Sequence, residues 1–317
     1  MVPAVPGTGG QSGPSFRAPE DGPSGLPGPL GSAQIGAVSF VWGVRTYVMG
    51  IVNVTPDSFS GDGLLAPPGA GPVAAVGPLA GALALGARMV AEGADLLDVG
   101  GESSRPGHRA VEAADEIART VPVIAALRAA YPALPISVDT VKPVVAAAAL
   151  DAGASLINDV WGVAEDDALA RLAAERGVPI VLMHNRAEAR YVNLMAEVVA
   201  DLERAIERAL RAGCRWEQLL IDPGFGFGKA PHHNLLLLRE LASLRVLARP
   251  ILLGTSRKST LGRVLDLPAE ARLEATLATT ALAIAAGVDL VRVHDVLANV
   301  RVARMTDAIV RNAMIQP

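Results

Sequence analysis

A local pattern recurs along the chain and limits the folds that it can adopt. Each copy is a helix-like segment rich in Ala, Leu and Arg, followed by a glycine, a short apolar run and then polar residues. The clearest copies lie at residues 91–102, 151–160, 175–184, 211–222 and 285–295. The glycine suits the left-handed conformation that ends a helix. An apolar run this short, without polar alternation, is typical of a strand buried on both faces.

Three further apolar runs, at residues 46–54, 135–140 and 250–256, bring the number of predicted strands to eight. Seven helical stretches lie between these strands, and an eighth spans roughly residues 297–313. Eight βα units predict an α/β fold of the (β/α)8 TIM-barrel type, which needs about 250 residues. An open, doubly wound sheet is the alternative that this pattern leaves.

The first part of the chain has a different composition. Residues 1–35 are rich in Gly, Pro and Ser, with Leu26 and Leu30 nearly isolated. Such a stretch buries too little apolar surface to offset the loss of chain entropy on folding. We therefore expect a disordered tail at 1–35 and one barrel domain at 36–317.

Charge and cysteine content narrow the class of protein. The net charge is −4, which argues against a general nucleic-acid surface but allows a locally basic pocket. No uninterrupted apolar run reaches about 18 residues, so we expect no transmembrane helix and no membrane partner. Cys214 is the only cysteine, and the N-terminus lacks the pattern of a signal peptide. These features predict a protein of the reducing cytoplasm.

Every predicted strand ends in polar or charged residues, and in a barrel these ends meet at one face, where function gathers. We therefore expect a shared active site built from these strand ends. The residues are Asn53, Glu102, Asp139, Asn158, Asp159, His184, Asp222, Ser256, Arg257, Lys258, Arg292 and His294.

Lysine and phenylalanine are rare, and their positions support this site. Only three of the 28 basic residues are lysines, and Lys142, Lys229 and Lys258 all follow predicted strand ends. An ammonium is a compact point charge that a guanidinium does not replace. Three of the five phenylalanines, Phe59, Phe225 and Phe227, also lie in such loops, where rings flank a flat ligand or pack on the barrel rim.

Eight sequence blocks, in order over about residues 45–300, resemble those of the dihydropteroate synthases. The first two are MGIVNVTPDSFSGDG (49–63) and DVGGESSRPG (98–107). The others are SVDTVKP (137–143), INDV (157–160), LMH (182–184), DPGFGFGK (222–229), SRKS (256–259) and RVHDV (292–296). The resemblance implies a TIM barrel that joins 6-hydroxymethyl-7,8-dihydropterin diphosphate to p-aminobenzoate and releases pyrophosphate.

The resemblance places Asp139, Asn158, Asp222 and Lys258 in a pterin pocket. Two carboxylates and an amide suit the N–H donors of the pterin's amino-pyrimidinone edge, and the lysine would donate to the ring's acceptors. An acidic pair also stabilises a cationic pterin as the leaving group departs. The alternative for the two aspartates is a helix cap after each strand. Asp139, Asp222 and Lys258 are the expected catalytic residues.

The resemblance also implies sites for the other ligands. Asn53 would bind Mg²⁺, a hard cation that prefers oxygen, while Arg105, Arg292 and His294 would bind the diphosphate. Ser104 offers a hydroxyl where many members carry Thr. Arg257 and Phe227 would flank the aminobenzoate, with Ser256 and Thr55 or Pro56 nearby.

The implied mechanism is a dissociative substitution, with loops 53–63 and 101–110 folding over the site. The resemblance further implies a homodimer. Two departures stand out: a longer, Pro- and Gly-rich stretch after Gly63, and Trp161 where a small residue is commoner. A pterin-binding paralogue without synthase activity and a pterin-dependent methyltransferase are the alternative functions.

Overall fold

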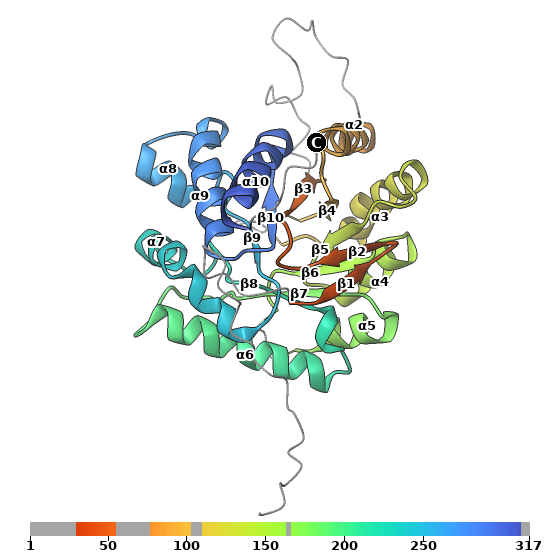
Figure 1. The fold of residues 1–317 in the computed structure, drawn as a ribbon. Helices are drawn as coiled ribbons and strands as arrows, with labels where there is room; N and C mark the ends of the chain where they lie inside the picture. Colours follow the sequence, from red (N-terminus) through yellow and green to blue (C-terminus); the bar gives the residue numbers. More distant parts are fainter. Residues whose placement is uncertain (1–29, 55–76, 103–109, 163–165, 312–317) are drawn as a thin grey trace, which may run out of the picture.

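The computed structural model describes residues 30–54, 77–102, 110–162 and 166–311. Eight parallel strands stand in the order β8-β7-β6-β5-β4-β3-β10-β9, and an isolated parallel bridge between Ile221 and Ile251 joins the two ends. The predicted (β/α)8 barrel is therefore confirmed (Figure 1). The strands are β3 (Tyr47–Asn53), β4 (Leu96–Gly100), β5 (Ile136–Asp139), β6 (Leu156–Asp159), β7 (Ile180–Met183), β8 (Leu219–Asp222), β9 (Leu252–Leu253) and β10 (Leu290–Val293).

Helices occupy every connection between these strands and cover the outside of the barrel. They are α2 (Pro78–Ala91), α3 (Ala113–Ala130), α4 (Pro143–Asp151), α5 (Ala168–Arg176), α6 (Leu194–Arg211), α7 (Pro231–Arg239), α8 (Ser259–Leu265), α9 (Leu273–Ala285) and α10 (Val296–Val310). Short 3-10 turns lie at Trp216–Gln218, Leu241–Leu247 and Ala269–Ala271. The glycines of the repeated pattern all take positive φ, as predicted: Gly93, Gly153, Gly177, Gly213 and Gly287.

Alternate strand residues point outward and build the larger of two hydrophobic cores. On β4, for example, Leu97 and Val99 are fully buried against the helices. Val138 on β5 and Leu219 on β8 belong to the same core. This arrangement explains why the strands read as continuous apolar runs, since their outward face is covered by helices and their inward face by the opposite strands.

The inward residues form two layers. The layer nearer the strand starts is apolar and consists of Met49, Leu96, Leu156, Val181, Leu220, Leu252 and Leu290, all buried. Two residues further along, Ile51 and Met183 remain apolar and Gly254 has no side chain, but Asp98, Asn158, Asp222 and Arg292 are polar, and Asp139 on β5 lies beside Asn158. Because side chains alternate between the faces of a strand, these polar groups lie directly above the apolar layer. We call the two sets the lower layer and the upper layer.

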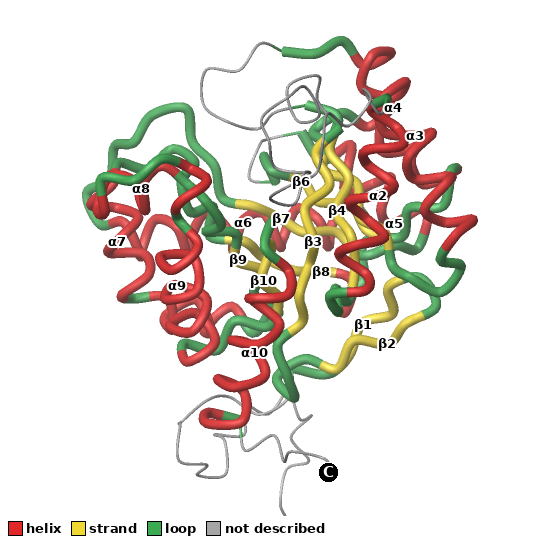
Figure 2. Tube along the Cα trace, turned by 90° about the horizontal axis from the view of Figure 1, so that it is seen from above, coloured by secondary structure: helices red, strands yellow, loops and turns green. Residues whose placement is uncertain are grey.

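A hairpin of β1 (Ser32–Ile35) and β2 (Val38–Val41) covers the lower layer. Its buried Ile35 and Phe40 pack in one cluster with that layer, and Figure 2 shows the hairpin at one end of the barrel. The rings of Phe40, Trp42 and Tyr47 pack together, with centroids 4.5 to 5.6 Å apart. The hairpin closes the barrel's amino-terminal mouth.

The hairpin corrects the predicted boundary of the tail. Ser32–Ile35, placed in the tail at 1–35, forms β1, because Ala33 and Ile35 supply two apolar side chains on one face that fill the barrel mouth. The rest of the predicted tail, residues 1–29, lies outside the described residues.

Two further sequence expectations concern the surroundings of the protein. Among the residues described, no helix has both the length and the apolar character needed to cross a bilayer. The thiol of Cys214 is buried and donates to the backbone oxygen of Ala170 over 3.2 Å. Burial raises the pKa of Cys214 to about 11, which leaves it a packing residue, not a nucleophile.

Candidate active site

The upper layer contains a guanidinium held between two carboxylates. Arg292 on β10 donates through Nε to Asp98 Oδ2 over 2.5 Å and through Nη2 to Asp139 Oδ2 over 2.6 Å. Asn158 on β6 donates to the same Asp98 oxygen over 3.1 Å. Both carboxylates are buried. Three neighbouring strands, β4, β5 and β6, and β10 on the other side of β3 thus contribute to one polar network.

Asp98 is a site residue that the sequence reasoning missed. It lies within the quoted block 98–107, but no role was assigned to it. The available signal was its position two residues before the end of β4, which puts it on the inward face together with Gly100. Its Oδ1 is buried and takes no hydrogen bond from the described residues. A buried carboxylate oxygen in this state is suited to accept from a ligand.

A second part of the upper layer surrounds Lys258. Asp222, Phe227 and Lys258 line a narrow cavity of about 20 Å³. The other lining residues are Asn158, Val160, Met183, Gly254 and Arg292. Lys258 Nζ lies 4.4 Å from the centroid of the Phe227 ring and donates to the backbone oxygen of Phe225. Three predicted pterin-pocket residues, Asn158, Asp222 and Lys258, therefore meet at one cavity, and Phe227, which was expected beside the aminobenzoate, lines it with them.

Burial shifts the pKa values of these groups towards their neutral forms. Desolvation raises the pKa of Asp139 to about 7, although the Arg292 guanidinium opposes the shift. The pKa of Asp222 is also raised by burial, against the pull of Lys258. Burial lowers the pKa of Lys258 to about 8. For Arg292 burial favours the neutral form too, but Asp98 and Asp139 outweigh it and raise the pKa. Asp222, Lys258 and Arg292 line the cavity and Asp139 pairs with Arg292 beside it, and perturbed groups gathered in this way are typical of a functional site.

The alternative for the two aspartates, a helix cap, does not describe their contacts. Asp139 pairs with Arg292 across the barrel. Asp222 accepts from the backbone N–H of Gly224 over 2.7 Å, within the turn that leaves β8. Neither contact caps a helix, so both aspartates are available to the upper layer.

Some of the residues predicted to bind diphosphate and aminobenzoate contact other protein groups in the structure, and the others lie outside the described residues. Ser256 Oγ lies 2.9 Å from His294 Nδ1 and also accepts the backbone N–H of His294. Arg257 has a φ of 58° and forms an ion pair with Asp295 at 2.6 Å. Arg292 was expected beside His294, but its Nε and Nη2 bind the carboxylates of the upper layer. Thr55, Ser104 and Arg105, with Pro56 and Phe59, lie outside the described residues, as do most of loops 53–63 and 101–110.

Asn53, the predicted metal ligand, ends β3 beside a glycine. A Cβ atom added at Gly100 would lie 3.7 Å from both Asn53 Oδ1 and Asp139 Oδ2. An amide oxygen and a carboxylate oxygen therefore lie near each other beside Gly100. Hard oxygen donors of this kind suit Mg²⁺, which needs few protein ligands. No cluster of three or more His, Cys, Asp or Glu side chains with metal-binding geometry occurs in the described part of the chain.

The other predicted strand-end residues take supporting positions. Lys142 forms ion pairs with Glu102 and with Glu116 of α3, and it does not line the Lys258 cavity. His184 and Lys229 form a buried pair below the Phe227 turn. Of the three lysines, only Lys258 reaches the upper layer's cavity.

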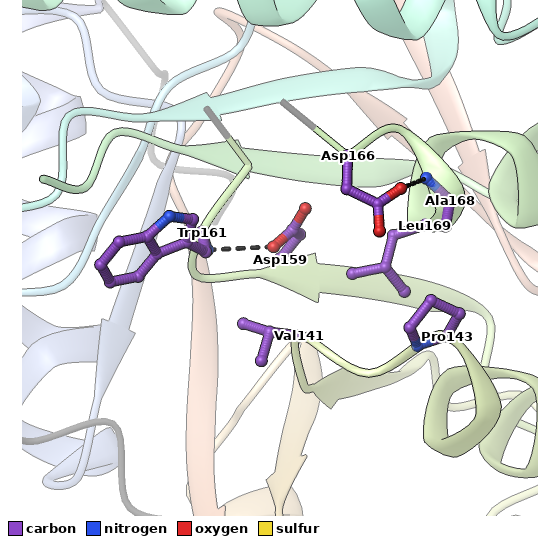
Figure 3. Close-up of a pocket in the computed structure, with 7 residues that line it drawn as sticks. All are labelled: Val141, Pro143, Asp159, Trp161, Asp166, Ala168 and Leu169. Atoms are coloured by element: carbon purple, nitrogen blue, oxygen red, sulfur yellow. Dashed lines mark hydrogen bonds between the residues drawn. The ribbon is translucent and has the colours of Figure 1, made fainter. Parts of the chain in front are cut away.

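A second, wider cleft of about 250 Å³ lies outside the barrel interior, between the starts of α4 and α5. In Figure 3 the Asp159 carboxyl group lies amid the lining residues, with Trp161 on one side and Pro143 and Leu169 on the other. Asp159 Oδ1 accepts from the Trp161 N–H over 2.9 Å, and burial raises its pKa to about 7. No cationic side chain lines this cleft within the described residues, so it does not suit a diphosphate.

Comparison with known proteins adds to this geometry. Residues 49–294 match the family described as pterin binding enzyme. The chain is 46% identical over 279 residues to a dihydropteroate synthase of Clostridium beijerinckii, covering 88% of this chain and 99% of that protein.

Two solved structures are similar over most of the chain. A dihydropteroate synthase from Clostridium difficile, in the presence of pteroic acid, shares 44% identity with a TM-score of 0.78 and covers 85% of this chain and 98% of its own. A dihydropteroate synthase from Xanthomonas albilineans with 4-aminobenzoic acid shares 42% identity with a TM-score of 0.80, covering 90% and 99%.

Proposed function

Because the chain belongs to the dihydropteroate synthases of the pterin-binding enzyme family, we propose that the upper layer of its barrel binds the dihydropterin and carries the reaction. The reaction condenses 6-hydroxymethyl-7,8-dihydropterin diphosphate with p-aminobenzoate to give 7,8-dihydropteroate and pyrophosphate. The bond between the exocyclic carbon and the diphosphate oxygen breaks, and its electrons leave with pyrophosphate. The amine lone pair forms the new C–N bond, and the amine loses a proton to pyrophosphate or water.

One observation carries the assignment of the pterin site: Asn158, Asp222 and Lys258 meet at the Phe227 cavity. The amide and carboxylate oxygens accept from the amino-pyrimidinone edge, while Lys258 donates to its ring acceptors. Phe227 provides an apolar face for the flat ring. The cavity is narrow, so the side chains that line it move apart when the pterin enters.

The buried carboxylates also suit the charge that develops during the reaction. As pyrophosphate departs, the pterin ring gains positive character, and the carboxylate forms of Asp139, Asp222 and Asp98 would stabilise it. A preorganised field in a dry site stabilises such a transition state without reorganisation. Arg292 keeps Asp98 and Asp139 in place through its two contacts, and its charge opposes the burial that raises the pKa of Asp139.

We extend the proposal to Mg²⁺ at Asn53, supported by Asn53 Oδ1 and Asp139 Oδ2, which both lie 3.7 Å from the position that a Cβ would take at Gly100. An ion held there would neutralise diphosphate charge. His294, with Ser256 at its Nδ1, lies on the inward side of the β10 end, two residues after Arg292, and donates towards the same anion. Arg257, fixed by Asp295, would border the aminobenzoate. Ser104, Arg105 and Thr55 complete these sites in the proposal.

We also propose a homodimer. Exposed apolar side chains gather on the last helices: Leu282 on α9 is 62% exposed, and Met305 and Ile309, one turn apart on α10, are 63% and 62% exposed. Helices α9 and α10 lie side by side in both views (Figures 1 and 2). A second copy of this face would cover these side chains. The family and the single buried thiol support a cytoplasmic location.

The test combines isothermal titration with a coupled pyrophosphate-release assay. The proposal predicts pterin binding together with release of pyrophosphate that depends on p-aminobenzoate. Pterin binding without release would identify a non-catalytic paralogue. Transfer of a methyl group from a methylated pterin, without pyrophosphate release, would identify a methyltransferase.

A further inference from the structure

The turn from Asp222 to Lys229 forms one wall of the pterin cavity and also positions Lys258. The Phe227 ring lines the cavity. The backbone oxygen of Phe225 accepts from Lys258 Nζ, and the same Nζ lies 4.4 Å from the Phe227 ring centroid. Any shift of this turn therefore moves a ring and a cation of the site together.

Lys229 connects two parts of this turn through hydrogen bonds. Its Nζ donates to the backbone oxygens of Gly224 and Phe227, each over 3.1 Å. These two carbonyl groups lie on either side of Phe225, whose own carbonyl holds Lys258. The third partner of Nζ is His184 Nδ1, at 2.8 Å. An ammonium has three protons, so its three donors are matched by three acceptors at a position only 9% exposed.

The third contact fixes the state of His184. A nitrogen that accepts from an ammonium carries no proton, so the proton is on Nε2, which donates to Asp201 Oδ2 over 3.0 Å. Burial, with the Lys229 charge, lowers the pKa of His184 to about 3, which keeps the ring neutral. Asp201 on α6 also pairs with Arg186 at 2.7 Å. Lys229 is thus attached through a neutral imidazole to a helix of the barrel's outer layer.

The backbone of the turn lies directly on the segment that carries His184. Gly224 has a φ of 68°, and a Cβ added there would come within 1.8 Å of the His184 oxygen. At Gly228, with a φ of 54°, a Cβ would come within 2.4 Å of the Arg186 oxygen. Tyr191 donates to the Gly228 oxygen over 2.8 Å. The turn therefore packs directly against this segment, and the Lys229–His184 contact also links the two.

Lys229 also affects the site through its charge. Burial raises the pKa of Asp222, and the positive charges that oppose this shift include Lys258 and, after it, Lys229. Burial lowers the pKa of Lys229 to about 7, and Asp222 is the largest influence that opposes this shift. In its protonated form Lys229 therefore lowers the pKa of Asp222, in addition to holding the turn.

We infer that Lys229 is a positioning residue for pterin binding, which holds the 222–229 turn so that Phe227, Lys258 and Asp222 keep their binding geometry. It does not line the cavity. This inference rests on the proposed function. A purely structural lysine would contribute to folding alone, and once the protein is folded its removal would leave pterin affinity unchanged.

The test is isothermal titration of the full chain with 6-hydroxymethylpterin, with thermal unfolding measured in parallel. Lys229→Met keeps the length of the side chain and removes its donors and charge. We expect it to weaken pterin binding by about 10- to 100-fold, the effect of losing charged hydrogen bonds that orient a site. It should also raise the pterin KM more than it lowers kcat.

Two variants of His184 form a matched pair. His184→Asn keeps an acceptor near the position of Nδ1 and should bind pterin within about threefold of the unmodified chain. His184→Leu removes the acceptor at similar volume and should weaken binding several-fold more than His184→Asn does.

Each result decides between the two roles. A folded Lys229→Met variant that binds pterin within twofold of the unmodified chain overturns the inference. Should that variant fail to fold, equal pterin affinity of His184→Leu and His184→Asn overturns it instead. An unmodified chain that does not bind the pterin contradicts the proposed function, which is a separate failure.

Discussion

The lower and upper layers of the barrel interior are built on the same strands, two residues apart. The lower layer is apolar and stabilises the fold, whereas the upper layer is polar and forms the candidate site. On β8 the fully buried Leu220 belongs to the apolar lower layer, and Asp222 follows in the upper layer. On β6 the same step leads from Leu156 to Asn158. The backbone positions both layers equally well, so the difference lies entirely in the side chains.

The two layers differ in what they contribute to stability. Full burial of a leucine side chain stabilises the fold by about 1.5–3 kcal/mol, and the β1–β2 hairpin completes that burial. The upper layer instead removes carboxylates and an ammonium from water, which destabilises a fold unless they are paired. The raised pKa of Asp139 and the lowered pKa of Lys258 both show this cost of burial. The apolar lower layer therefore stabilises the barrel, whereas burial of the polar upper layer destabilises it.

The largest expected effect is on turnover, from Lys258→Ala in the upper layer. Loss of one preorganised donor typically lowers the rate by about 10²–10³-fold, and we expect a loss of this size in kcat/KM while the variant remains folded. Lys142→Ala is the matched control, because that lysine pairs with Glu102 and Glu116 and does not line the cavity. Steady-state kinetics of both variants decides. Normal activity of Lys258→Ala would remove that residue from the site.

The next effect is on stability, from Leu156→Ala in the lower layer. Truncation of a buried leucine costs about 2–5 kcal/mol, including the cavity that it leaves. We expect the free energy of unfolding, measured with denaturant, to fall by this amount, while pterin affinity below the unfolding transition stays within twofold. A large loss of pterin affinity would show that the layers are not independent.

A smaller effect should appear in the pH dependence of stability. The pKa of Asp139 in the folded chain is about 7, above its usual value, so the folded state binds more protons than the unfolded state between about pH 4 and 7. Its contribution to stability is therefore greatest below this window and falls as pH rises through it, by up to about 1 kcal/mol per pH unit. Unfolding free energies at pH 5 and 7.5 should fall more for the unmodified chain than for Asp139→Asn. Parallel changes would contradict the raised pKa.

The smallest effect concerns the first residues. Deletion of residues 1–29 should change the free energy of unfolding by less than about 1 kcal/mol, because their composition supplies few apolar side chains. Deletion of 1–35 removes β1 as well, with buried Ala33 and Ile35, and should cost several times more. Thermal unfolding of the two truncated chains tests the boundary. Equal melting temperatures would show that β1 contributes nothing to the lower layer.

Most of the barrel could be predicted from the sequence, because buried parallel strands leave a local signal of short apolar runs after helix-ending glycines. All eight predicted strands are present. The β1–β2 hairpin was missed, since its buried residues are few and its role depends on filling the mouth of a barrel formed by distant strands. That information is absent from residues 32–35 alone.

Site residues at the ends of strands could be predicted from the sequence. Contacts between residues from opposite sides of the barrel could not. The expectation that strand ends meet at one face of a barrel, together with the family blocks, predicted that Asn158, Asp222 and Lys258 share one site. They did not reveal Asp98, which lies one step below its strand end, or the pairing of Arg292 with it. Nor did they show that Lys258 lines the cavity while Lys229 does not. The acceptors of Lys229 are backbone oxygens and His184, which follows β7, and these contacts leave no local signal in the sequence.

The separation of the lower layer from the upper layer is tested most directly by Leu220→Ala and Asp222→Asn on β8. Pterin affinity and the free energy of unfolding should be measured for both variants. We predict that Leu220→Ala loses about 2–5 kcal/mol of stability and binds pterin within twofold of the unmodified chain. Asp222→Asn should keep or gain stability and lose pterin affinity at least tenfold. Equal losses of both properties in both variants would contradict the account.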